Sequence, residues 1–430
     1  LIIMKSLRIG LCGVGNVGGA VLKTLTSSSE LLKIQGGVQF DLVQVGARKG
    51  KKAVPFDGIE VSTNLREVAT NPEIDVFVEL IGGVDLAYEL VTDAINSGKH
   101  IVTANKALIS KFGNDLFTQA KKNNVEIGFE ASVAGGTPVV KALREGLVAN
   151  KVIWFAGILN GTSNYILSEM ESNQTSFEEA LEKAQELGLA ESDPSLDING
   201  TDAAQKASIL AALSFHVPFD FSFVSFEGIQ EVEVKDLKYA NELGYSIKHI
   251  AHGELNKKVV SVTAFPTLVS HENLLSKVGK EMNALEIFSE GVGSTVYYGP
   301  GAGPDPTASA VLADLVDIAK GGWEVDIINN KLYKLELPDN KKSAYYYRLN
   351  VKDEPGVIAK ITSLFGKKDI SIDALIQHES REKEHIDFVP LVIISGEISD
   401  IDAIKLKTSL EKLPEVSLGI KKFRIHSGQK

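Results

Sequence analysis

The sequence predicts an α/β protein: a doubly wound parallel sheet, then an α+β region, then a ferredoxin-like module. Over residues 5–130, short apolar runs alternate with amphipathic stretches, and such strand–helix alternation is typical of a doubly wound parallel sheet. From about residue 138 helices mix with further strands, and residues 345–425 follow the order strand, helix, strand, strand, helix, strand. A chain of 430 residues has room for two to three domains of about 150 residues.

We expect domains at 4–135 and 136–320, a polar linker at 321–344 and a C-terminal domain at 345–425. The helix expected over 306–320, which Pro306 is suited to begin, would pack back on the first domain. The last 100 residues carry 18 Lys and Arg against 15 Asp and Glu, whereas the whole chain has a net charge of −11. The C-terminal part is therefore compositionally distinct.

The expected strands of the first domain are rich in Ile and Val and mostly lack a period of two, as strands buried on both faces should. They are Leu7–Cys12, Phe40–Ala47, Asp75–Ile81, His100–Ala104 and Val125–Glu130, with helices at Val17–Thr26, Leu86–Ser97 and Phe112–Asn123. For the second domain the pattern predicts helices at Pro138–Val148, Phe177–Leu187, Asp202–Phe215 and Val234–Leu243, and strands at Val152–Leu159, Val259–Phe265, Ala284–Phe288 and Ser294–Tyr298.

The composition excludes several classes of protein. Hydrophobic residues make up 44% and charged residues 23%, the balance of a folded chain. Cys12 is the single cysteine, which excludes an intramolecular disulfide framework and a cysteine-based zinc or iron–sulfur site. No apolar run reaches the roughly 18 residues of a membrane span, no signal sequence is recognisable, and the negative charge argues against nonspecific nucleic-acid binding. We expect a cytoplasmic protein.

A glycine-rich turn directly follows the first buried strand and opens a helix. Its pattern, GxGxxG, predicts dinucleotide binding: the first glycine makes the tight turn, the second lets a pyrophosphate approach, and the third lets helix and strand pack closely. The pyrophosphate would lie at the helix N-terminus. A purely structural turn is the alternative. The residues expected to bind the cofactor are Gly13, Val14, Gly15, Asn16, Val17 and Gly18.

The end of the second strand predicts the choice of cofactor. NAD-binding chains carry an acid there for the ribose, but this strand runs into Gly46-Ala47-Arg48-Lys49-Gly50. Arg48 and Lys49 are suited to a ribose 2′-phosphate, so NADP is favoured over NAD. The alternative is that both are solvated loop residues.

Two lysines stand out as candidates for chemistry. Lys106 follows the strand that ends at Thr103-Ala104, at the sheet edge where ligands bind in open α/β sheets, although a loop lysine is usually only solvated. Lys206 follows four carboxylates within twelve residues (191–202) and lies four residues after Asp202, so the two share a helix face. A surface ion pair is the alternative. The rest of that helix is apolar on nearly all faces, which favours a buried lysine suited to acid–base work.

The chain resembles homoserine dehydrogenases over essentially its full length. The matching stretches are Gly13–Gly18, Val78–Gly83, Gly98–Leu108, Phe129–Pro138, Gly157–Tyr165, Gly188–Lys206 and Gly299–Thr307. The resemblance implies a Rossmann cofactor domain and a mixed α/β domain for substrate binding and dimerisation. It also implies reversible, NAD(P)-dependent interconversion of L-homoserine and L-aspartate 4-semialdehyde, in threonine, methionine and isoleucine biosynthesis.

The resemblance assigns roles by position. Lys206 matches the proton donor and Lys106 a second active-site lysine near the substrate and nicotinamide. The substrate-binding positions are Glu191, Asp197, Asp202 and Thr162, and further cofactor-binding positions are Thr103, Lys106, Gly188 and Gly303. A sodium or potassium ion bound by one carboxylate and backbone carbonyls would be structural, with hard oxygen ligands at Glu130, Val133, Gly135 and Thr137. Thr137 departs from the usual branched apolar residue, which a carbonyl ligand tolerates.

The segment Tyr345–Ile361 resembles the start of an ACT domain, with Asp353-Glu354-Pro355-Gly356 between its first strand and helix. ACT domains often bind amino acids between paired copies, so threonine is the candidate effector. A purely oligomerising module is the alternative, and the assembly is expected to be a homodimer or homotetramer.

Two alternatives to homoserine dehydrogenase follow from the same residues. One is a noncatalytic regulator that senses a cofactor and an amino acid, against which the intact Lys106 and Lys206 argue. The other is a dehydrogenase acting on aspartate itself, which would not be expected to carry the stretch Gly188–Lys206. His216, His249 and His252 have no ligand partners at useful spacing and are interpreted as ordinary core or surface residues.

Overall fold

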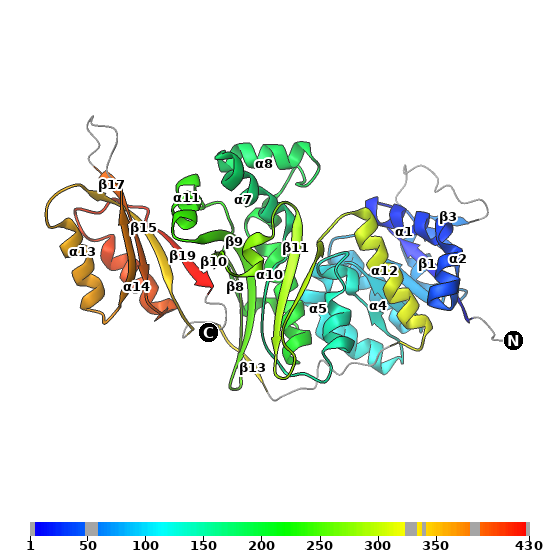
Figure 1. The fold of residues 1–430 in the computed structure, drawn as a ribbon. Helices are drawn as coiled ribbons and strands as arrows, with labels where there is room; N and C mark the ends of the chain where they lie inside the picture. Colours follow the sequence, from blue (N-terminus) through cyan, green and yellow to red (C-terminus); the bar gives the residue numbers. More distant parts are fainter. Residues whose placement is uncertain (1–4, 48–58, 323–332, 338–340, 379–387, 427–430) are drawn as a thin grey trace.

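The computed structural model describes residues 5–47, 59–322, 333–337, 341–378 and 388–426. The chain forms an elongated molecule with the N-terminal sheet at one end, a larger sheet in the middle and the C-terminal module at the other end (Figure 1). Among the described residues no helix is long and apolar enough to cross a membrane.

The N-terminal sheet is parallel throughout, in the order β3-β2-β1-β4-β5-β6. Its strands are β1 (Lys5–Cys12), β2 (Val38–Gly46), β3 (Glu60–Ser62), β4 (Val76–Glu79), β5 (His100–Thr103) and β6 (Ile127–Gly128). The strand order reverses between β1 and β4, which is where a doubly wound sheet binds its ligand. The predicted fold of this region is therefore confirmed.

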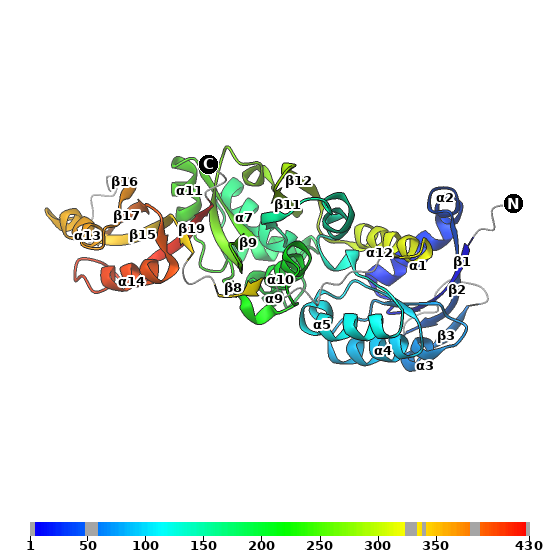
Figure 2. The same ribbon diagram turned by 90° about the horizontal axis from the view of Figure 1, so that it is seen from below.

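Helices cover both faces of this sheet (Figure 2). One face packs on α1 (Asn16–Ser27) and α12 (Pro304–Ala319), and the other on α3 (Leu65–Thr70), α4 (Asp85–Asn96) and α5 (Lys106–Lys122). Successive strand residues alternate between the two cores: Val76 and Val78 lie in one, Phe77 in the other. Such two-sided burial explains the continuous apolar runs in the sequence.

The middle of the chain builds an antiparallel array on which α10 (Thr201–Phe215) packs. Its strands are β7 (Val152–Ile158), β9 (Tyr245–Asn256), β10 (Val259–Ser270), β11 (Met282–Ser289) and β12 (Gly293–Pro300), with short β8 (Val224–Phe226) and β13 (Lys334–Leu335) beside β10. The other helices of this region are α6 (Val139–Lys141), α7 (Gly161–Asn173), α8 (Phe177–Glu186), α9 (Ser195–Ile198) and α11 (Val234–Glu242).

The C-terminal module has the predicted βαββαβ order. Its strands β15 (Tyr345–Lys352), β16 (Ile372–Gln377), β17 (Phe388–Ser395) and β19 (Lys421–His426) are packed by α13 (Val357–Gly366) and α14 (Asp400–Leu410). Strand β19 also pairs in parallel with β10, so one sheet of eleven strands runs through both regions. At this junction the buried Arg348 guanidinium holds the buried Asp236 carboxylate of α11 at 2.6 Å.

Several boundaries differ from the sequence-based expectation. Helix α5 begins at Lys106 rather than Phe112, because the Asn105 side chain accepts a hydrogen bond from the Leu108 amide and caps the helix. The segment expected as one helix over Pro138–Val148 is only α6 followed by a π-helical turn. The described parts of the expected linker include β13 and β14 (Lys342–Ser343), which pairs with β18 (Ile398–Ser399). Strands β3 and β9 and helix α3 were not predicted.

Candidate active site

The glycine turn after β1 has the geometry that its sequence predicts. Gly13 has φ +105°, where other residues are strained, and a Cβ there would overlap the Leu80 carbonyl oxygen at the end of β4. A Cβ on Gly18 would overlap the Gly13 carbonyl oxygen. Gly15 begins helix α1 without a side-chain cap, so the first helical amides remain available to a ligand. The residues therefore fit a pyrophosphate on the helix N-terminus.

The end of β5 is fixed by a buried carboxylate. The Thr103 hydroxyl donates to Glu79 Oε2 at 2.6 Å and accepts from the Asn105 amide at 3.0 Å. Burial raises the pKa of Glu79, although the Thr103 hydroxyl and the amides after β4 oppose that rise. Lys106 is consequently held in the first turn of α5, at the carboxyl edge of the sheet.

Asp202 brings the two candidate lysines together. Its Oδ2 lies 2.8 Å from Lys206 Nζ, and its Oδ1 lies 3.0 Å from Lys106 Nζ. Asp202 and Lys206 are buried, whereas the Lys106 side chain is 37% exposed. Burial alone would raise the pKa of Asp202, but the two ammonium groups hold it well below its usual range. The charge of Asp202 in turn raises the pKa of Lys106. Asp202 is thus ionised at neutral pH, and Asp202, Lys106 and Lys206 form a carboxylate–lysine cluster.

A second carboxylate, that of Asp197, is tied to the cluster through Asn160. The Asn160 amide donates to Asp202 Oδ2 at 2.8 Å and to Asp197 Oδ1 at 2.7 Å, and its Oδ1 caps α7 by accepting from the Ser163 amide. Burial raises the pKa of Asp197, and the neighbouring charge of Asp202 adds to the effect. The N-cap of α7 is therefore Asn160.

The other predicted substrate positions lie farther out. The Thr162 hydroxyl donates to the Leu189 carbonyl at 2.7 Å, which ties α7 to the acidic turn. Glu191 is exposed, and its charge is among those that raise the pKa of Lys106.

Two of the predicted cofactor positions are glycines with positive φ. Gly188 follows α8 at φ +70°, and Gly303 precedes α12 at φ +115°, conformations that favour glycine.

The predicted cation site centres on the buried Glu130. Its carboxylate accepts from the amides of Val140 at 3.0 Å and Lys141 at 2.7 Å, and burial raises its pKa to about 7. The Thr137 hydroxyl is buried without a hydrogen-bond partner among the described residues. A buried carboxylate group is the kind of hard oxygen ligand that suits a monovalent cation. Arg48 and Lys49 lie outside the described residues.

Asn283, which the sequence did not indicate, shares a hydrogen-bond acceptor with Lys206. The Leu159 carbonyl accepts from Lys206 Nζ at 2.8 Å and from Asn283 Nδ2 at 3.0 Å. Asn283 is buried, its Oδ1 has no partner among the described residues, and a Cβ on Gly301 would overlap its amide. Asn283 therefore links the Leu159 carbonyl, which accepts from Lys206, to the turn before α12. A lone asparagine within an apolar strand, 77 positions after Lys206, carries no local signal of this contact.

Replacing Asn283 by leucine is expected to lower kcat about tenfold, because the Leu159 carbonyl loses one of the two donors that orient it toward Lys206. The matched control is Asn164→Leu, since Asn164 is equally buried but does not bond the Leu159 carbonyl; it donates to the carbonyls of Val278, Lys280 and Met282. Steady-state kinetics and thermal melting of both variants test this. Equal losses of kcat at equal loss of stability would contradict a specific role.

Comparison with known proteins decides the family. The model of the homoserine dehydrogenase catalytic domain matches residues 138–316, that of its NAD-binding domain residues 13–130, and that of the ACT domain residues 348–410. A homoserine dehydrogenase from Pseudomonas aeruginosa is 40% identical over 98% of this chain and 99% of its own length. The chain belongs to the homoserine dehydrogenase family.

Further relatives agree with this membership. A homoserine dehydrogenase from Helicobacter pylori is 40% identical over 96% of this chain and 97% of its own. The crystal structure of a homoserine dehydrogenase from Thiobacillus denitrificans superposes with a TM-score of 0.92 at 39% identity, covering 98% of this chain and 99% of that one. A hyperthermophilic archaeal homoserine dehydrogenase in complex with NADPH matches 74% of this chain and 98% of its own, with a TM-score of 0.63 at 26% identity.

Family membership separates the functional alternatives. The chain is an oxidoreductase with a Rossmann NAD(P)-binding domain, a catalytic domain and an ACT domain. A noncatalytic sensor is not supported, since the catalytic-domain model matches and the relatives at about 40% identity extend over nearly the whole chain.

Proposed function

We propose that this protein interconverts L-homoserine and L-aspartate 4-semialdehyde, with Lys206 as the group that moves the proton. The observation that carries the proposal is Asp202, which holds Lys206 and Lys106 together at the carboxyl edge of the cofactor domain. A bound nicotinamide supplies the hydride in the reducing direction and accepts it in the oxidising direction. Lys206, protonated, stabilises the charge that grows on the aldehyde oxygen and donates its proton there.

In the oxidising direction Lys206 accepts the hydroxyl proton of homoserine, and Asp202 stabilises the ammonium that forms. Lys106 shares the stabilisation of the oxygen, since it binds the other oxygen of the same carboxylate. The substrate ammonium is assigned to Asp197, Asp202 and Glu191, and Thr162 supports the wall of that pocket through its bond to the Leu189 carbonyl. The acids supply the negative charge that a substrate ammonium needs.

The proposed cofactor is NADP, with Arg48 and Lys49 at the ribose 2′-phosphate and the turn Gly13–Gly18 at the pyrophosphate. Thr103, Lys106, Gly188 and Gly303 would line the rest of the cofactor site. The double variant Arg48→Ala/Lys49→Ala is expected to raise the KM for NADP at least tenfold and leave the KM for NAD within twofold, because NAD lacks the phosphate. Both values come from initial rates at saturating homoserine. An equal effect on both cofactors would remove these residues from the 2′-phosphate site.

A structural sodium or potassium ion is proposed at Glu130, with the carbonyl oxygens of Val133, Gly135 and Thr137 completing its shell. Tetramethylammonium is too large for the site and is not coordinated by oxygen ligands. Replacing both sodium and potassium by this ion is therefore expected to lower the melting temperature by several degrees. The variant Glu130→Gln should melt at the same temperature in either salt. A wild-type protein that melts identically in the two salts would contradict the site.

The C-terminal ACT domain is proposed to bind threonine as an inhibitor, and the enzyme to assemble as a homodimer or homotetramer. The proposed domain limits remain 4–135, 136–320 and 345–425, with α12 packed on the first domain. Light scattering after gel filtration gives the assembly, and a monomer would contradict it. The enzyme is proposed to work in the cytoplasm.

A further inference from the structure

Glu79, the last residue of β4, is a fully buried carboxylate to which the proposed reaction gives no role. The register of the parallel sheet sets it between Cys12, at the end of β1, and Thr103, at the end of β5. All three lie at the carboxyl edge of the sheet, next to the point where the strand order reverses. A doubly wound sheet receives its ligand at that edge.

The hydrogen bonds of Glu79 suit a carboxylate. Its Oε1 accepts from the Ile81 amide at 2.8 Å, and its Oε2 accepts from the Thr103 hydroxyl at 2.6 Å. The Gly82 amide and the Asn105 side chain also favour the charged form. These groups are all donors, whereas a carboxylic acid would also have to place its own proton. The hydrogen bonds therefore favour the anion over the acid.

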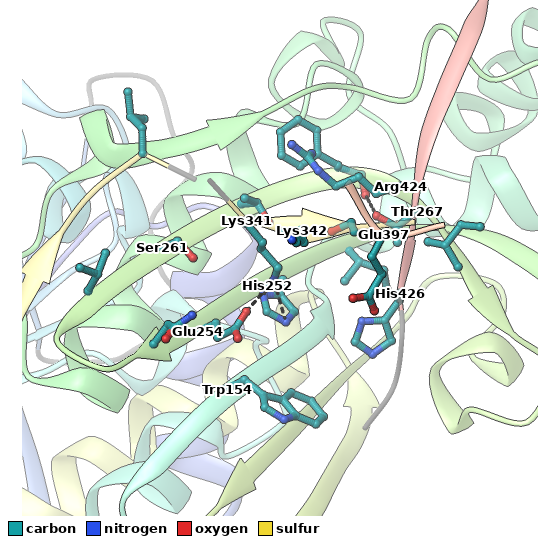
Figure 3. A pocket seen from close by; sticks show the side chains of 18 of the residues that line it. Trp154, His252, Glu254, Ser261, Thr267, Lys341, Lys342, Glu397, Arg424 and His426 are labelled. Carbon is teal, nitrogen blue, oxygen red and sulfur yellow. Dashed lines mark hydrogen bonds and ion pairs between the residues drawn. The ribbon is translucent and has the colours of Figure 1, made fainter. Parts of the chain in front are cut away.

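No lysine or arginine of the described part of the chain forms an ion pair with Glu79. Asp202, by contrast, contacts two ammonium groups. In the cavity between the middle sheet and the C-terminal module, Lys341 Nζ likewise lies 2.9 Å from Glu254 Oε2 (Figure 3). A buried charge without a partner is costly, and burial accordingly raises the pKa of Glu79. A positive charge brought to this edge by a ligand would offset that cost.

The nicotinamide ring carries a positive charge when it is oxidised and none when it is reduced. We propose that Glu79 is the counter-charge of the oxidised ring, so that the enzyme favours the oxidised cofactor over the reduced one. The bound pair is thereby biased toward reduction of the aldehyde. This proposal rests on the proposed function, from which it takes the cofactor and the reaction. Because a buried charge is weakly screened, Glu79 acts without touching the ring.

Glu79 is connected to both halves of the site. The carbonyl of Leu80, the next residue, lies where a Cβ on Gly13 would overlap it, so this carbonyl packs against the cofactor turn. On the other side, the hydroxyl that donates to Glu79 accepts from the Asn105 amide. Asn105 caps α5, whose first residue is Lys106. The anion is therefore fixed between the cofactor turn and the carboxylate–lysine cluster.

Glu79→Gln tests the charge, because it keeps the shape of the side chain. The dissociation constants of both cofactor forms are measured on the full-length enzyme without substrate, NADPH by its fluorescence and oxidised NADP by displacement of NADPH. The variant should weaken binding of oxidised NADP about tenfold relative to NADPH, the effect expected of a unit charge across a partly buried site. If NAD binds more tightly than NADP, NAD and NADH are the pair measured. An unchanged ratio of the two constants, in a variant folded by circular dichroism, would overturn the proposal.

Two further variants separate charge from packing. Glu79→Asp retains the charge and should keep the ratio within threefold of wild type. A tenfold change there would contradict the proposal, and this measurement holds even if Glu79→Gln does not fold. The control is Asp75→Asn, because Asp75 directly precedes β4 at the opposite edge of the sheet, where it pairs with Arg8. A ratio that changes as much in Asp75→Asn as in Glu79→Gln would also count against Glu79.

The rate of hydride transfer in a single turnover, followed in both directions, gives a second readout. Glu79→Gln should slow reduction of the aldehyde at least fivefold more than oxidation of homoserine, because only the oxidised ring loses a favourable interaction. A merely structural role would slow both directions equally, and that result would overturn the proposed bias. Absence of turnover in the wild-type enzyme would count against the proposed reaction, and the ratio of the dissociation constants would still decide the role of Glu79.

Discussion

Lys206→Ala is expected to lower kcat for homoserine oxidation about 10³-fold, the usual contribution of a positioned general acid or base. Lys206 is the buried ammonium that lies between the Leu159 carbonyl and Asp202, and alanine leaves no group there to accept the hydroxyl proton. The glycine turn is untouched, so the dissociation constant of the cofactor, measured by fluorescence titration, should stay within about threefold.

Lys248→Met is the matched control for that substitution. Lys248 is equally buried and donates to the Val278 carbonyl at 2.9 Å, but lies outside the carboxylate–lysine cluster. Its replacement is expected to change the melting temperature and leave kcat within threefold. If Lys206→Ala retained a tenth or more of the wild-type kcat, Lys206 would not be the group that moves the proton.

Asp202→Asn is expected to lower both activity and stability, because two ammonium groups lose their common carboxylate. Removing one partner of a buried ion pair costs about 3–5 kcal/mol of unfolding free energy. The pKa of Lys106 should also fall, since the charge of Asp202 is the largest cause of its elevation. The pH dependence of amine acetylation at Lys106, followed by mass spectrometry, should move to lower pH in the variant.

The stability difference between wild type and Asp202→Asn has a defined pH dependence. The pKa of Asp202 is depressed in the folded protein, so its stabilisation is complete above the unfolded pKa of about 3.9 and is lost as pH falls toward the folded value. Urea unfolding should show a constant difference from pH 5 to 8 and a shrinking one below about pH 4. The control, Asp236→Asn, removes a buried acid paired with Arg348 and should leave Lys106 acetylation unchanged. An unchanged acetylation profile in Asp202→Asn would contradict the cluster.

The sequence predicts those parts of the site whose residues are close neighbours in the chain. Asp202 and Lys206 are four positions apart on one helix, and the glycines of the turn are within six positions, so their geometry is local. The position of Lys106 at the sheet edge made it a candidate, but its role required the resemblance, because nothing nearby indicates that it meets a carboxylate 96 positions later. Asn160 and Asn283 were not predicted for the same reason. The role of a single side-chain amide depends on hydrogen-bond partners that are distant in the sequence.

Fold prediction failed where tertiary pairing overrides local pattern. Strand β9 carries Lys248, His249 and His252 and shows no clean period, yet it pairs with β10 along all twelve residues. Strand β3 has three residues, too few for any periodicity. The union of the two sheets through β10 and β19 brings together residues about 157 positions apart, a long-range pairing that neither strand signals by itself.

Absorbance at 340 nm, with purified enzyme, L-homoserine and NADP or NAD in parallel at alkaline pH and with sodium or potassium present, tests the central claim most directly. Cofactor reduction that depends on homoserine, faster with NADP, is the predicted result. A folded protein that reduces neither cofactor would contradict the proposed reaction.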